Sequence, residues 1–163
     1  MNKTQAFPWD HPRFRSWISV ARACQLMQQA LGRALAPLDI KPPHLDILVN
    51  LYRFEGISQQ ELARKLLVGR SNMSMLLPQM EKRGLLERRP DQRDKRVLRL
   101  ALTDEGRALS EKAMRIQTEL IERTLSATPL EDCQRLADNM DLLIQRMLSS
   151  DDMKDLEISE DRG

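Results

Sequence analysis

Basic and hydrogen-bonding side chains gather in one stretch of this chain, and together they could bind a nucleic acid. Between Arg64 and Arg99 there are 11 Lys or Arg residues against 4 Asp or Glu residues, although the net charge of the 163-residue chain is only +2. Such a block is the electrostatic footprint of phosphate binding. The alternative is a solvated basic face, which is common in a chain with 31% charged residues.

The same stretch contains side chains of the types that recognise base edges. Asn and Gln can pair bidentately with adenine, Ser hydroxyls suit several edges, and Met can pack on a thymine methyl group. The candidates for DNA contact in this first group are Arg70, Ser71, Asn72, Ser74, Met75 and Gln79. For each of them, the alternative is a solvated polar position on a helix.

Two short helices are expected to carry this group. Ser58 and Glu61 have the spacing of a capping box, in which each side chain accepts from the other's backbone N–H, so a helix should begin there. Gly69 predicts a turn, and a second helical pattern starts at Arg70. Two helices joined in this way form a helix-turn-helix, whose second helix enters the major groove of DNA.

The second helix has an apolar face and a polar face. The residues expected to point inward at 100° per residue are Met73, Leu76, Leu77 and Met80. Pro78 lies on the outer face, where a proline inside a helix costs about 3 kcal/mol. We expect the helix to continue through a kink at Pro78 and to end at Gly84.

A β-ribbon with a charged tip should follow. Leu98, Leu100 and Leu102 alternate with other residues at the period of a half-buried strand. Residues 85–89 are the expected partner strand, and the sequence PDQRDK between the strands is rich in turn-forming and charged residues. With another helix starting at Thr103, the whole is predicted to be a winged helix-turn-helix.

The pattern Asp94-x-Arg96-x-x-x-Leu100-x-Leu102-Thr103-x-x-Gly106 resembles the wing and wing exit of the MarR family of bacterial transcription regulators, with Leu100 where Val is more usual. The resemblance runs without an evident gap from about residue 40 to residue 106. It implies that the Asp94–Arg96 pair fixes the ribbon while a neighbouring basic residue enters the minor groove.

The candidates for this minor-groove contact are Arg93, Lys95 and Arg96, because a narrow A·T-rich groove attracts cations. Arg88, with Arg89 and Arg99, is expected to contact phosphates or to form salt bridges on the ribbon. The alternative for the tip is a solvated hairpin.

The remaining chain is predicted to be helical around the winged helix. Residues 1–12 should be non-helical because of Pro8 and Pro12. Helices are expected over residues 13–35, 42–54 and 103–126, and a further helix should then start with a capping box formed by Thr128 and Glu131. At the start of the second of these helices, Lys41 stands where the MarR family usually has Ser or Thr, and its side chain cannot cap.

The terminal helices carry more apolar residues than a winged-helix core can use. The residues assigned to a dimer interface are Trp17, Leu31, Leu120, Leu136, Met140, Leu143 and Met147. The resemblance implies a homodimer built from these helices.

The predicted fold is mainly α with a small β-wing. We divide it into an arm and dimerisation helix (1–38), a DNA-binding domain (39–106), C-terminal dimerisation helices (107–149) and an acidic tail (150–163).

Several functional classes find no support in the sequence. There is no nucleophile–base pair, phosphate loop or metal-ligand spacing, so we expect neither an enzyme nor a bound cofactor or metal. The N-terminus lacks an apolar signal segment and no stretch could span a membrane, so a cytoplasmic location is expected. Cys24 and Cys133 lie on apolar seams, where cysteines are usually inert.

The sequence therefore favours a DNA-binding regulator, and the family resemblance implies a repressor of its own and neighbouring genes. Its partners would be a pseudo-palindromic operator in double-stranded DNA, a second copy of the chain, and an unidentified small ligand of the phenolic or anionic class. Two alternatives stay open. One is a repressor of the same fold that senses thiol oxidation, and the other is a winged-helix protein-interaction module without DNA binding.

Overall fold

The computed structural model describes residues 7–66 and 70–150, with the side chains of residues 70–72 outside the described set. The predicted turn at Gly69 and the acidic tail from residue 151 onward also lie outside it. The elements in chain order are η1 (Pro8–Asp10), α1 (Phe14–Leu35), η2 (Ala36–Leu38), α2 (Pro42–Arg53), α3 (Gln59–Lys65), α4 (Arg70–Lys82), β1 (Leu86–Pro90), β2 (Leu98–Leu102), α5 (Asp104–Leu125) and α6 (Leu130–Ser149). The chain is mainly α with one two-stranded antiparallel sheet, as predicted.

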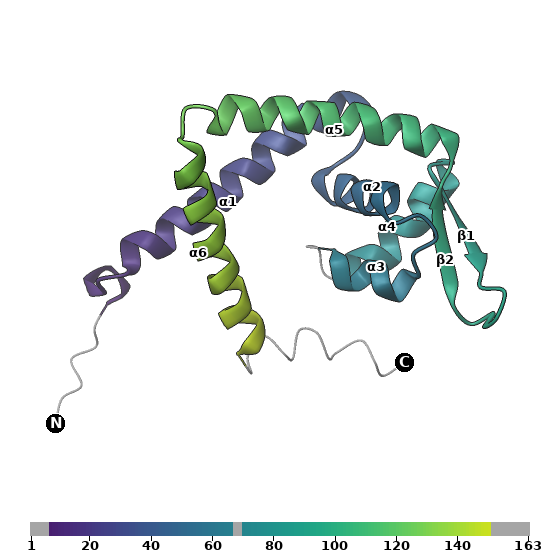
Figure 1. The fold of residues 1–163 in the computed structure, drawn as a ribbon, viewed down its shortest axis with the longest axis horizontal. Helices are drawn as coiled ribbons and strands as arrows, with labels where there is room; N and C mark the ends of the chain where they lie inside the picture. Colours follow the sequence, from purple (N-terminus) through teal and green to yellow (C-terminus); the bar gives the residue numbers. More distant parts are fainter. Residues whose placement is uncertain (1–6, 67–69, 151–163) are drawn as a thin grey trace.

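The hydrophobic core lies in the winged helix-turn-helix. Helices α2, α3 and α4, the β-ribbon and the first half of α5 surround it, while α1 and α6 extend away from it (Figure 1). The four residues predicted to face inward from α4 are all buried, with Leu77 and Met80 fully so. The helix continues through Pro78, as predicted, and the Pro78 ring is exposed.

Local hydrogen bonds set the ends of the helices. The Ser58 hydroxyl accepts from the Glu61 N–H at 3.1 Å and the Glu61 carboxylate accepts from the Ser58 N–H at 2.9 Å, which confirms the predicted capping box. Gly84 has a φ of +71°, and the Leu85 N–H donates to the Met80 carbonyl at 3.0 Å, so α4 ends in a Schellman motif.

Helix α2 begins with a contact that the sequence analysis missed. The Lys41 side chain caps nothing, as expected, but the Lys41 N–H donates to Nδ1 of His44 at 2.9 Å. His44 lies at the third helical position, so its ring does what a Glu or Gln does in a capping box. Burial, with the nearby positive charges of Arg83 and Lys41, lowers the pKa of His44 below its usual value.

Two predictions, one about the N-terminal residues and one about the start of α6, are wrong. Residues 8–10 form a short 3₁₀ turn, because Pro8 fixes the φ of the first position and the Asp10 N–H reaches the Phe7 carbonyl at 3.0 Å. The capping box at Thr128 does not form. Pro129 is the N-cap of α6, and the Thr128 N–H instead donates to the Leu125 carbonyl at 2.9 Å, which closes the end of α5.

The wing strands pair with a register that places Leu86 opposite Leu102 and Arg89 opposite Arg99. The segment before α3 adds to this ribbon, because the Gly56 N–H donates to the Leu100 carbonyl and the Leu100 N–H donates to the Ile57 carbonyl, both at 2.9 Å. The wing is therefore attached by backbone hydrogen bonds to the connection between α2 and α3.

The exit from the wing is tightly packed. The Thr103 hydroxyl accepts from the Gly106 N–H at 3.0 Å and so caps α5, as predicted. A Cβ atom placed on Gly106 would lie 1.8 Å from the Leu85 carbonyl oxygen. Only glycine allows the first turn of α5 to approach the wing backbone this closely.

Helices α1 and α6 leave apolar side chains uncovered. The Trp17 side chain is 68% exposed and Leu136 is 53% exposed, and α6 has no buried residue among those described. Phe7 and Trp9 stack on each other with ring centroids 4.6 Å apart, and both remain more than half exposed. In the described parts of the chain, no helix is both long and apolar enough to cross a membrane.

Candidate nucleic-acid interface

The outer face of α4 is where base-reading residues were predicted. Ser74, Met75 and Gln79 are exposed there, and Met75 is the one large apolar side chain of this group, with 57% of its surface accessible. Arg70, Ser71 and Asn72 occupy the first turn of α4, and their side chains are outside the described set. The burial of the opposite face orients Ser74, Met75 and Gln79 away from the core.

At the wing tip, Asp94 and Arg96 form the predicted pair. The Arg96 Nε and Nη2 atoms donate to the two Asp94 carboxylate oxygens at 3.1 Å and 3.2 Å, and the Arg96 N–H also donates to Asp94 at 3.0 Å. The Arg96 side chain is nevertheless 92% exposed. The pair therefore shapes the turn and still presents a cation to solvent.

Asp91 organises the tip, and the sequence analysis did not identify it. Its carboxylate accepts from the N–H groups of Arg93 and Asp94 at 2.8 Å and 3.1 Å, and from Nε of Arg99 at 2.8 Å. The Arg99 hydrogen bond, followed by the two backbone N–H groups, lowers the pKa of Asp91 below its ordinary value. The Arg96 side chain likewise lowers the pKa of Asp94.

The other basic residues of the ribbon divide into two groups. Arg88 donates to Glu81 of α4 at 2.7 Å, and Arg89 pairs with Glu87 on the same strand, so both form the salt bridges that were one of their two predicted roles. Arg93 and Lys95 are exposed, and no ion pair joins either of them to another described residue. The tip thus offers three cations, of which Arg93 and Lys95 are uncompensated within the described chain.

A pocket of about 190 Å³ lies away from the wing, between α1, α2 and α5. Its lining residues are Gln28, Leu31, Pro42, Pro43, Leu45, Asp46, Val49 and Gln117. Asp46 lines this pocket while half-buried. Among the described residues, no three His, Cys, Asp or Glu side chains gather to bind a metal ion.

The predicted dimerisation residues lie on α1, α5 and α6 and differ in exposure. Trp17, Leu136 and Met147 are exposed, whereas Met140 and Leu143 are partly buried. Leu31 and Leu120 are also partly buried, and Leu31 packs against the core. Cys24 is exposed on α1, and Cys133 is partly buried near the start of α6.

A helix-turn-helix with a polar outer face on its second helix, followed by a charged two-stranded ribbon, defines a winged helix-turn-helix protein. Comparison with known proteins narrows this class. Residues 38–97 match the model of the MarR family. An uncharacterised HTH-type transcriptional regulator from Bacillus cereus is 28% identical over 98 residues, which are 60% of this chain and 65% of that relative. The alignment thus covers just under two thirds of the relative's length.

Solved structures share the fold over most of the chain. AbsC, a MarR family transcriptional regulator from Streptomyces coelicolor, is 22% identical with a TM-score of 0.77, covering 83% of this chain and 93% of AbsC. CouR from Rhodococcus jostii RHA1, bound to p-coumaroyl-CoA, is 25% identical with a TM-score of 0.71 and coverages of 86% and 95%. CouR bound to a 23-mer DNA duplex is 28% identical with a TM-score of 0.68 and coverages of 78% and 89%. Residues 38–97 thus match the MarR family model, and most of the chain has the fold of MarR family regulators.

Proposed function

We propose that this protein is a DNA-binding transcription regulator that acts as a homodimer on an inverted-repeat operator. The observation that carries the proposal is the wing tip, where Arg93, Lys95 and Arg96 project from a turn that Asp91 and Asp94 hold by hydrogen bonds. Cations on a fixed turn suit insertion into a minor groove, because their position is set before DNA binds. CouR, which shares this fold, is bound to a DNA duplex in a solved structure, and this supports the DNA-binding part of the proposal.

Helix α4 supplies the second contact. Its N-terminal half would enter the major groove, with Arg70, Ser71, Asn72 and Ser74 at base edges or phosphates. Met75 and Gln79 follow on the exposed face. Arg88 is less available than the tip residues, since its guanidinium is engaged with Glu81 and 28% exposed, so its role is to hold β1 on α4.

The uncovered stripes on α1 and α6 support the homodimer. Several of their large apolar side chains, including Trp17 and Leu136, are more than half exposed in one protomer. A second copy would cover them, because apolar burial stabilises association. Two recognition helices one DNA turn apart then read two half-sites.

The pocket between α1, α2 and α5 is the proposed effector site, and release of DNA on effector binding would make the protein a repressor. Leu31, Leu45 and Val49 give the pocket apolar walls, and no Lys or Arg is among its lining residues. The Asp46 carboxylate would repel an anion, whereas it can accept a hydrogen bond from a hydroxyl group. Of the two effector chemistries considered from the sequence, the pocket favours a neutral phenol.

The test is binding to a labelled fragment from upstream of the protein's own gene, at several salt concentrations. The wild type should bind with nanomolar affinity and a steep salt dependence, and Arg96→Ala should weaken binding while reducing the salt slope by about 1. Lys112→Ala is the matched control, because it removes one exposed positive charge from α5 instead of from the wing.

Weak binding to any DNA that Arg96→Ala leaves unchanged would contradict the wing assignment and favour the protein-interaction module. A phenol series can be added to the same assay. Release of the wild type, but not of Val49→Trp, would identify the pocket as the effector site, because the larger side chain fills a cavity of about 190 Å³.

A further inference from the structure

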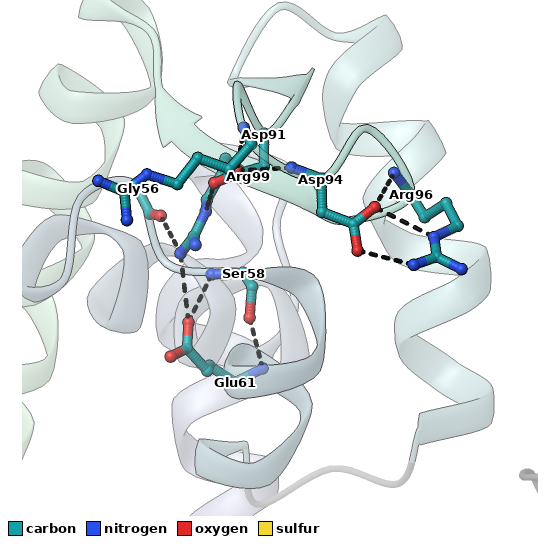
Figure 2. Close-up of polar contacts among 8 residues, drawn as sticks. Gly56, Ser58, Glu61, Asp91, Asp94, Arg96 and Arg99 are labelled. Carbon is teal, nitrogen blue, oxygen red and sulfur yellow. Dashed lines mark hydrogen bonds and ion pairs between the residues drawn. The ribbon is translucent and has the colours of Figure 1, made fainter.

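Arg99 connects three parts of the winged helix that are distant in sequence. It lies in β2, and its guanidinium leaves the ribbon to contact Asp91, Gly56 and Glu61 (Figure 2). The Nε atom donates to the Asp91 carboxylate at 2.8 Å, and Nη1 donates to the Gly56 carbonyl at 3.3 Å. Nη1 also lies 3.6 Å from the Glu61 carboxylate. We call these four residues the Arg99 cluster.

Each partner of Arg99 controls a different element. Asp91 accepts the N–H groups of Arg93 and Asp94, so it shapes the turn that presents the wing cations. Glu61 accepts the Ser58 N–H and so forms one half of the cap of α3. Gly56 belongs to the segment between α2 and α3 that bonds to β2. The cluster therefore joins the wing tip to the first helix of the helix-turn-helix.

The charges around Arg99 make it a poor phosphate contact. Its single positive charge lies between the carboxylates of Asp91 and Glu61, so the three side chains together carry a net charge of −1. The Ser58 N–H is the main group that lowers the pKa of Glu61, and Arg99 is the main group that lowers the pKa of Asp91. Both carboxylates are thus ionised at neutral pH. Arg96, in contrast, faces one carboxylate and points away from the cluster (Figure 2).

We propose that Arg99 is a positioning residue for DNA binding, which fixes the wing tip relative to α3 through Asp91, Glu61 and the Gly56 carbonyl. The proposal rests on the function proposed above. A planar guanidinium is suited to this task, because it donates in several fixed directions at once, whereas the ammonium group of a lysine does not. The wing cations then meet the DNA at a set distance from the recognition helix.

Asp91→Asn separates positioning from simple electrostatics by the sign of its effect. If Asp91 acted only as an acidic group near DNA, its removal would tighten binding, because one repulsive charge is lost. If Asp91 positions the wing, the same substitution weakens binding, and we expect a loss of about five-fold or more. Glu87→Gln is the matched control. It removes one carboxylate from the same ribbon but from a residue that pairs only with Arg89 among described residues, so it should bind as tightly as wild type or more tightly.

Arg99→Lys separates positioning from phosphate contact. A phosphate contact survives in Arg99→Lys and is lost in Arg99→Gln, whereas the bridging geometry is lost in both. We therefore expect the two variants to bind with similarly reduced affinity. Binding by Arg99→Lys at the wild-type level, together with weak binding by Arg99→Gln, would overturn the proposal.

Amide hydrogen exchange gives a readout without DNA. The Arg93 and Asp94 amides donate to Asp91, so they should exchange faster in Asp91→Ala, which removes the acceptor, and in Arg99→Gln, while core amides such as that of Leu77 keep their protection. Unchanged exchange at the tip would overturn the positioning role. If the wild type failed to bind operator DNA, the proposed function would fall while this measurement still decided the role of Arg99. If the wild type bound and Asp91→Asn bound equally well, only the role of Arg99 would fall.

Discussion

Gly106 offers the sharpest test of the packing between the wing and α5. Its Cα lies so close to the backbone of Leu85 that an added Cβ would meet the Leu85 oxygen at 1.8 Å and the Leu85 carbonyl carbon at 2.8 Å. Real Cβ contacts essentially never fall below 3.0 Å, so Gly106→Ala requires the two backbones to separate by about 1.2 Å. No side-chain rotation can relieve this clash, because the obstructing atoms belong to the main chain.

The expected cost follows from three contributions. Overpacking costs about 1–3 kcal/mol. The separation also weakens the hydrogen bond from the Thr103 N–H to the Leu85 carbonyl, now 3.2 Å long, which contributes about 1 kcal/mol. The higher helix propensity of alanine offsets about 0.5–1 kcal/mol of this destabilisation. The free energy of unfolding should therefore fall by roughly 1–3.5 kcal/mol, which lowers Tm by roughly 2–14 °C.

Gly32→Ala is the matched control. Gly32 also lies in a long helix, but a Cβ there would meet its nearest atom, Cδ of Pro42, at 3.8 Å, which is an ordinary contact. The substitution should raise the free energy of unfolding by about 0.5–1 kcal/mol. Circular dichroism at 222 nm, recorded during heating, measures both variants. The protein concentration is kept the same, since the Tm of the proposed dimer would depend on it.

The two substitutions are expected to shift Tm in opposite directions. A Gly106→Ala protein that unfolds at or above the wild-type temperature would refute the tight contact with Leu85. A Gly32→Ala protein that loses as much stability as Gly106→Ala would show that both effects come from the helices themselves and not from the approach to the wing.

Three further predictions concern helix ends and α4. Because the pKa of His44 is lowered in the folded protein, its contribution to stability is full above the unfolded pKa of about 6.5 and is lost as pH falls through the folded pKa. The Tm should therefore drop between pH 8 and pH 5.5 by more in wild type than in His44→Gln, a substitution that keeps an acceptor for the Lys41 N–H. The control His11→Gln should behave as wild type. Pro78→Ala restores a donor for the Ser74 carbonyl, which gains about 3 kcal/mol, and loses proline's effect on the unfolded chain, which is about 0.4–1 kcal/mol. The free energy of unfolding, measured by urea denaturation, should therefore rise by about 2–2.6 kcal/mol. Ser58→Ala removes the acceptor for the Glu61 N–H and should cost about 1 kcal/mol in the same measurement, whereas no change would mean that the cap of α3 is unimportant.

Local patterns predicted the fold because the interactions that define them are local. Ser58 and Glu61 are three residues apart, and both halves of their capping box are present. The alternation from Leu98 to Leu102 gave the second wing strand directly. The Thr128 motif failed although it is also local, because the turn that closes α5 uses the Thr128 N–H and helix α6 starts one residue later than the motif requires.

Contacts between distant residues could not be predicted in this way. Asp91 and Arg99 face each other across the wing turn, and Glu61 joins them from a helix far earlier in the chain. Nothing in the spacing of these residues indicates that they meet, since the meeting depends on how the ribbon folds back on α3. The Arg88–Glu81 pair is of the same kind. The assignments of Arg70, Ser71 and Asn72 to DNA contact stay predictions.

Helix α5 is a long, continuous connection between the wing and α6. It contains 22 residues, which corresponds to a length of about 33 Å at a rise of 1.5 Å per residue. One end is joined to the wing by the close contact between Gly106 and Leu85, and the other end leads into α6 (Figure 1). Because Gly106 packs directly against the Leu85 backbone, α5 and the wing should move together. A tilt of about 5° in a straight rod of this length moves its far end by about 3 Å. In the proposed dimer, a small change in angle where the terminal helices meet the second copy would therefore become a shift of atomic dimensions at the wing.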